Sequence, residues 1–89
     1  AQQQSITEAA AEIQALLEQL DKTYSTDTTT GKMALATEAI AQIEGNPTLS
    51  ARILSALKTG GIKAFEKFLS HPAASFVAGA LEDWQKTKG

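Results

Sequence analysis

Apolar residues that recur at alternating spacings of three and four positions are the feature that most constrains this chain. They are clearest near the start of the sequence, at Ile6, Ala10, Ile13, Leu17, Leu20 and Tyr24. This alternation places apolar side chains along one face of an α-helix, as in the a/d seam of packed helices. Because every strong periodic signal in the sequence is helical, we predict an all-α fold.

The ends of the first helix are marked by polar residues. Ser5 and Glu8 stand at the spacing of a capping box, which predicts a helix from about Ile6 to Tyr24. The polar run of residues 25–30 ends this helix, because short hydroxyl and carboxylate side chains compete for backbone hydrogen bonds.

Glycine and proline mark the later breaks. A second helix ends at Gly45, a residue suited to the left-handed position after a helix. Asn46-Pro47 reads as an N-cap followed by proline in the first turn of a third helix. Gly60-Gly61 closes that helix, with a positive φ expected at Gly60, and a short fourth helix follows over residues 62–69. Ser70-His71-Pro72 repeats the cap-then-proline pattern and opens a fifth helix.

The fifth predicted helix carries apolar residues around more than half of its circumference, so we expect neighbours on more than one side and place it at the centre of the fold. Ser75 and Gly79 lie four apart and leave room for a neighbouring backbone. Residues expected in the core include Met33, Phe65, Phe68, Phe76 and Trp84. The resulting prediction is a compact bundle of about five helices with a long N-terminal helix. It forms a single domain over residues 6–88 after a linker remnant at residues 1–5.

Composition restricts the chemistry available to 89 residues. Cysteine is absent, which removes disulfides, thiolate metal sites and a cysteine nucleophile. The single histidine leaves little for a zinc site or a serine triad, so we expect no metal, cofactor or catalytic residue. No apolar stretch approaches the roughly 20 residues of a membrane span, and the first residues lack the pattern of a signal peptide. We therefore expect a cytoplasmic protein.

Two functional alternatives need particular residues. A small enzyme would use His71 as its general base, although a partly exposed helix-cap residue explains this histidine more simply. A nucleic-acid binder would use the basic residues Arg52, Lys58, Lys63 and Lys67. The net charge of −2 argues against that alternative, because nucleic acids attract a strongly positive field.

Charge is unevenly divided between the two halves of the chain. Residues 1–45 carry seven acidic and two basic side chains, a formal charge of −5. Residues 46–89 carry six basic and three acidic side chains, a formal charge of +3. Such halves attract each other within one chain or between two antiparallel chains.

The seam of the first helix is the candidate interaction surface. Its residues are Ile13, Leu16, Leu17 and Leu20, with Glu12, Glu18 and Asp21 beside them. A narrow a/d seam about three heptads long suits pairing with another helix. It either packs on the remainder of the bundle or meets the basic half of a second chain.

Several short runs of sequence resemble one known module. They are residues 16–20 (LLEQL), 32–33 (KM), 43–49 (IEGNPTL), 56–61 (ALKTGG), 71–72 (HP) and 80–85 (ALEDWQ). Together they resemble a small helical module at the C-terminal end of cyanobacterial multidomain proteins, notably those with pentapeptide repeats. The resemblance covers about residues 13–86 and implies an appended association module with no assigned activity. We therefore expect a non-enzymatic protein–protein interaction or oligomerisation module, which binds a partner protein or forms a homodimer.

Overall fold

The computed structural model describes residues 2–88, with side chains described for residues 6–87. It contains four helices: α1 (Gln2–Leu20), α2 (Thr29–Glu44), α3 (Pro47–Lys67) and α4 (Ala74–Lys88). No strand occurs in this part of the chain. The radius of gyration is 11.9 Å, close to the roughly 12 Å expected for a compact chain of this length. The all-α prediction is confirmed. The predicted third and fourth helices together form α3, which contains a non-helical residue at Gly61, so the count of four differs from the predicted five only there.

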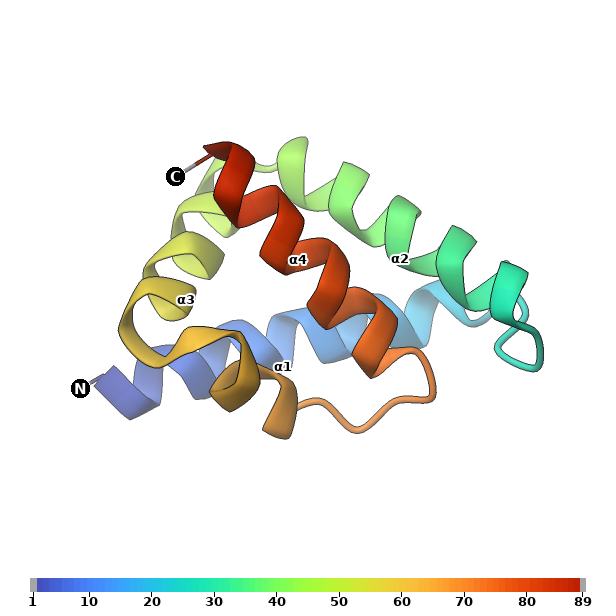
Figure 1. Ribbon diagram of the computed structural model, residues 1–89, viewed down its shortest axis with the longest axis horizontal. Helices are drawn as coiled ribbons and strands as arrows, with labels where there is room; N and C mark the ends of the chain where they lie inside the picture. The colour runs from blue at the N-terminus through green and yellow to red at the C-terminus, as the bar shows by residue number, and fades with distance from the viewer. Residues whose placement is uncertain (1, 89) are drawn as a thin grey trace.

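The helices pack as two pairs, α1 with α3 and α2 with α4 (Figure 1). The backbone of α3 also approaches α2 and α4, so α3 contacts all three other helices. Within residues 2–88, the backbone of α4 closely approaches only α2 and α3. The prediction that the last helix occupies the centre of the fold is therefore wrong: α2 and α3 each contact all three other helices, whereas α4 contacts two.

Apolar side chains from all four helices form one core. The largest fully buried members are Phe65, Ile13, Leu17, Leu35, Ile43, Ile53, Leu81 and Val77. On α4 the predicted division holds, because Val77, Leu81 and Trp84 are buried whereas Ser75 and Asp83 are exposed. Met33 and Phe68 are corrections, since they are 55% and 41% exposed.

Helix α1 lies four residues earlier in the sequence than its caps predict. It begins at Gln2 and ends at Leu20, and Tyr24 lies in the irregular segment that follows and packs against the core. Ser5 is inside the helix, so it does not cap the start, and its side chain lies outside the described residues. The helix also runs through the segment expected to be a linker. At 19 residues it is long, but α3, with 21 residues, is longer.

The connection between α2 and α3 follows the predicted cap. The Asn46 side-chain oxygen accepts a hydrogen bond from the Leu49 backbone N–H at 3.1 Å, and Pro47 is the first residue of α3. Gly45 ends α2 in a right-handed conformation with φ of −77°, so the expected left-handed position is absent there. The Ser50 hydroxyl donates to the Ile43 carbonyl at 2.6 Å and ties the two helix ends together.

The double glycine divides α3 into two helical parts, as predicted, and the non-helical residue between them is Gly61. Gly61 has φ of 81° and ψ of 164°, a region of backbone space open essentially to glycine alone. The positive φ is therefore at Gly61, and its prediction at Gly60 is wrong. Gly60 serves a different purpose, because a Cβ atom there would lie 2.1 Å from Cδ1 of Ile6. The bend lets α3 turn across the start of α1.

Candidate functional site

The apolar residues of the α1 seam lie in the core. Ile13 and Leu17 are fully buried, Leu20 is 6% exposed, and the half-buried Leu16 packs against the same cluster. A second chain could contact Ile13, Leu17 or Leu20 only if the bundle opened. Of the two alternatives, these residues therefore follow the one in which the seam packs on the remainder of the bundle.

The charged residues beside the seam have partners within the same chain. Glu12 forms an ion pair with Arg52 of α3, and the Glu18 carboxylate accepts a hydrogen bond from the Gln14 amide at 3.0 Å. Asp21 lies 2.7 Å from His71. The Glu12–Arg52 ion pair joins the acidic and basic halves within one chain, as one of the two charge arrangements predicts, and the contact of Asp21 with His71 joins the same two halves.

His71 connects the end of α1 to the start of α4. Its Nδ1 atom accepts the Ala73 backbone N–H at 3.0 Å, which places the ring proton on Nε2, where it is donated to Asp21. The imidazole is 2% exposed, so it is a buried link and not the partly exposed cap that the sequence suggested. Because both ring nitrogens are engaged, the geometry provides no free base at this position.

An open groove lies between α2 and α4. It consists of two adjoining cavities of about 440 Å³ and 200 Å³ that share Thr37 and Ala80. We call this surface the α2–α4 groove. Its lining residues are Met33, Ala36, Thr37, Ile40, Ala41 and Glu44 from α2, and Phe76, Ala80, Asp83, Trp84 and Thr87 from α4.

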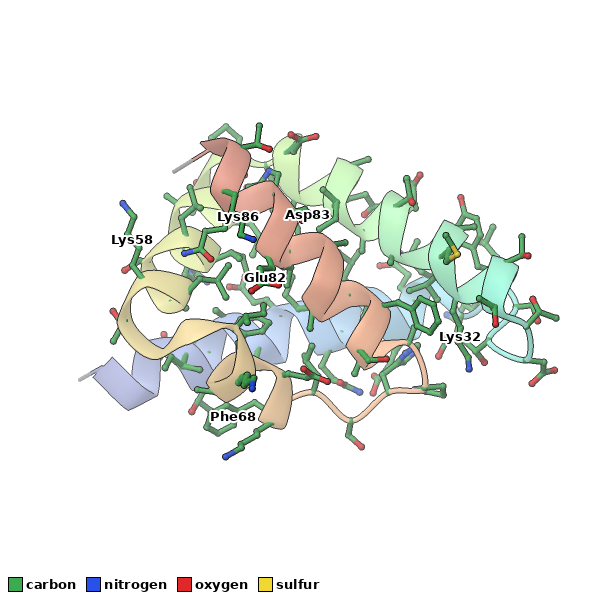
Figure 2. All side chains as sticks on the ribbon, viewed as in Figure 1. Lys32, Lys58, Phe68, Glu82, Asp83 and Lys86 are labelled. Carbon is green, nitrogen blue, oxygen red and sulfur yellow. The ribbon has the colours of Figure 1, made fainter. Side chains whose placement is uncertain are left out.

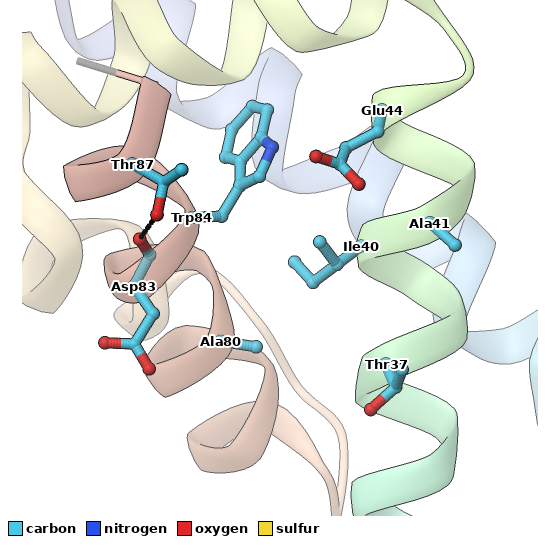
Figure 3. Close-up of a pocket in the computed structure, with 8 residues that line it drawn as sticks. All are labelled: Thr37, Ile40, Ala41, Glu44, Ala80, Asp83, Trp84 and Thr87. Atoms are coloured by element: carbon cyan, nitrogen blue, oxygen red, sulfur yellow. Dashed lines mark hydrogen bonds between the residues drawn. The ribbon is translucent and has the colours of Figure 1, made fainter.

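Trp84 forms the floor of the larger cavity. Its side chain extends from α4 towards α2, with the indole nitrogen on the side of Glu44 (Figure 3). The residue is 6% exposed, yet the buried indole N–H has no hydrogen-bond partner. A buried donor without a partner typically costs about 1–3 kcal/mol in folding free energy.

The polar side chains of the groove either lie at its ends or form hydrogen bonds with the backbone of their own helix. The Thr37 hydroxyl donates to the Met33 carbonyl at 2.9 Å, and the Thr87 hydroxyl donates to the Asp83 carbonyl at 3.1 Å. At one end the Lys32 ammonium lies 5.8 Å above the centre of the Phe76 ring. The acidic side chain of Asp83 lies at the other end (Figure 2). The groove therefore has an uncharged middle with opposite charges at its two ends.

A second hollow separates α4 from the last part of α3, but it differs in character. It has a volume of about 240 Å³, and charged residues such as Lys63, Glu66 and Glu82 line it. A Cβ atom added at Gly79 would have no neighbour within 4 Å. The close backbone approach expected at Ser75 and Gly79 therefore does not occur.

Sequence reasoning missed the α2–α4 groove, although part of the signal is visible. Met33, Thr37 and Ala41 repeat at a spacing of four and form an uncharged, exposed stripe on α2. Because Met33 is expected in the core, the sequence does not identify this stripe as an exposed surface. The depth beneath it comes from Ala80 and Trp84 on a helix more than thirty residues away, so the α2 pattern alone could not show it.

Within residues 2–88, no group of three or more acidic or histidine side chains is placed to hold a metal ion. None of the helices in this range combines the length and apolar character that crossing a membrane requires. No protein-family model, curated protein or solved structure matches the chain.

Proposed function

We propose that this chain is a non-enzymatic protein–protein association module whose contact surface is the α2–α4 groove. The observation that carries the proposal is an open apolar groove above Trp84, whose buried indole N–H lacks a hydrogen-bond partner.

The construction of the groove suits binding by an apolar segment. Trp84 and Ile40 provide a floor that packs against the core, so little side-chain entropy is lost when a ligand covers it. Met33 is unbranched and exposed at the rim, and methionine adapts readily to the shape of a partner. Tryptophan in a desolvated pocket is also a frequent energetic centre of protein interfaces.

The partner chemistry follows from the groove itself. An amphipathic helix or extended peptide would place apolar side chains over Ala41 and Ala80. A carbonyl or hydroxyl oxygen on that segment would satisfy the Trp84 indole N–H if the ring shifted slightly towards solvent. A basic side chain at one end would meet Asp83.

The experiment is a selection from a displayed library of random peptides against the immobilised protein. Thr37→Trp fills the shared middle of the groove, and Thr59→Trp places the same side chain on an exposed position of α3 outside it. Selected peptides should bind wild type and Thr59→Trp equally and Thr37→Trp at least about tenfold more weakly. Equal binding to all three proteins, or no enrichment at all, would contradict the proposal.

A further inference from the structure

The α2–α4 groove is complementary to a second copy of itself, and we infer that two copies associate face to face through it. This inference rests on the proposed function and names the partner. The copies are related by a two-fold axis that crosses both helices at the level of Thr37 and Ala80, the residues shared by the two cavities. A two-fold contact uses the same surface on both copies, so one self-complementary face is sufficient.

On α2 the two-fold axis brings a large residue of one copy opposite a small residue of the other. Such an axis reverses the helix direction, so each residue before Thr37 on one copy faces the residue equally far after Thr37 on the other. Met33 thereby faces Ala41, which means that the exposed methionine of each copy meets the larger cavity of its partner.

The same symmetry applies to α4. Phe76 lies four residues before Ala80 and Trp84 lies four residues after it, so the half-buried phenylalanine of one copy faces the tryptophan floor of the other. Aromatic rings at such a contact add stability beyond the area they bury. The methionine sulfur that enters the same cavity is also a favourable neighbour for an aromatic ring.

Charge favours this arrangement over the alternative two-fold axis parallel to the helices. Lys32 lies at the Phe76 end of the groove and Asp83 at the Trp84 end, and Figure 2 shows the two at well-separated positions. Reversal brings the Lys32 end of each copy to the Asp83 end of the other. A parallel axis would instead place each end against its own like charge. The uncharged stripe of Met33, Thr37 and Ala41 then forms the centre, with charges at the rim, as in stable protein interfaces.

The size of the face limits the strength of the dimer. Helix α2 has 16 residues and is therefore about 24 Å long. Two packed helices are about 20 Å wide, so two such faces bury roughly 1,000 Å² in total. This area lies at the lower limit for specific association, and we expect a dimer that forms and dissociates over the micromolar to millimolar range.

Sedimentation equilibrium of the purified chain over that range tests the inference. Wild type should change reversibly from monomer to dimer as its concentration rises. Thr37→Arg places two like charges at the axis and should weaken association by at least about tenfold, whereas Thr59→Arg on α3 should not change it. Both substituted positions are exposed, so circular dichroism should show folded proteins in each case.

Charge reversal provides a second, independent test. Lys32→Glu and Asp83→Lys should each weaken the dimer, and the double variant should recover most of the loss because every cross-chain pair is opposite again. A wild-type chain that stays monomeric at millimolar concentration would overturn the inference, as would a Thr37→Arg dimer of unchanged strength. If peptides selected for the groove still bind that monomer, self-association alone has failed. If they do not bind, the proposed function has failed as well.

Discussion

The α1–α3 pair and the α2–α4 pair use their outer residues in opposite ways. Along α1, side chains reach across to distant parts of the chain: Glu12 to Arg52, Gln14 to Ser70 and Asp21 to His71. Between α2 and α4 the middle of the surface is uncharged and leaves an open groove above a buried tryptophan, with Asp83 and Glu44 towards one end. The polar groups along α1 therefore link distant parts of the chain, whereas the surface between α2 and α4 remains open.

The difference also shows where a helical pattern does and does not identify an interface. The α1 seam has the regular apolar spacing of a pairing helix, yet most of its residues are buried in the core. The stripe on α2 is weaker and less apolar, yet it remains exposed. In a domain of this size, the strongest amphipathic helix is needed for the core.

The largest expected effect on the free energy of unfolding comes from placing two aspartates in the buried α1 seam. A matched pair of aspartates on the exposed face of α2 serves as the comparison. Ile13→Asp with Leu17→Asp introduces two carboxylates at fully buried positions, and each unpaired buried charge costs several kcal/mol. Since a small domain has only about 5–15 kcal/mol in total, the double variant should show no cooperative unfolding transition. Chemical denaturation followed by circular dichroism measures this.

The matched variant has the same spacing on the open side. Thr37→Asp with Ala41→Asp changes two exposed residues of α2, so the protein should stay folded and lose about 1 kcal/mol or less through helix propensity. The measurement belongs at a concentration where wild type is monomeric. A folded core variant, or an unfolded groove variant, would remove the distinction between the two sides.

Trp84 belongs both to the buried core and to the floor of the α2–α4 groove. Trp84→Ala should lower the free energy of unfolding by about 3–5 kcal/mol, the usual cost of removing a large buried aromatic side chain. Trp84→Phe should cost less, since the indole N–H that it removes has no hydrogen-bond partner. Urea titrations of the three proteins provide the values. A loss under about 1 kcal/mol for the alanine variant would mean that Trp84 is not part of the core.

Two glycines should respond to alanine with opposite signs. Gly61→Ala forces a side chain into a backbone region of positive φ and should destabilise the protein by about 1–3 kcal/mol. Gly79 is in the exposed part of α4 with open space around it, so Gly79→Ala should stabilise the protein by up to about 1 kcal/mol. Thermal denaturation of both variants checks the signs. Equal changes in stability for the two variants would show that the conformation of Gly61 does not exclude a side chain.

The smallest effect concerns the Glu12–Arg52 ion pair. Both side chains are more than two-fifths exposed, so solvent screens their attraction. A double-mutant cycle with alanine should give a coupling of about 0.2–1 kcal/mol that decreases as salt is added. A coupling well above this range, or one that salt does not change, would show that the pair is more shielded than its exposure indicates.

Local chemistry made much of the fold predictable. The apolar spacing of α1, the Asn46-Pro47 cap and the break at the double glycine each depend on neighbouring residues, and each is found near its predicted position. The start of α1 could not be placed from Ser5, because a capping motif inside a stable helix simply continues as helix. The exposure of Phe68 depends on where the helix ends: α3 ends at Lys67, two residues before the end of the predicted fourth helix, and Phe68 is its C-cap.

The site depends on contacts between residues that are far apart in the sequence, which a local sequence pattern does not predict. Burial of His71 requires Asp21 to lie beside it, and the two are 50 residues apart. The groove requires α2 and α4 to run side by side with small residues between them. Which face of α2 remains uncovered is decided only when all four helices are packed.

The contact between Gln14 and Ser70 has a consequence for which substitutions the loop before α4 can accept. The Gln14 amide donates to the Ser70 carbonyl at 2.8 Å and accepts the Ser70 N–H at 3.0 Å. The Gln14 side-chain amide thus makes both hydrogen bonds to the Ser70 main chain that a peptide group of a neighbouring β-strand would make. Position 70 then tolerates any residue except proline, because only its main chain is recognised. At position 14 glutamate lacks the donor and lysine lacks the acceptor, whereas asparagine keeps both groups but is one methylene shorter.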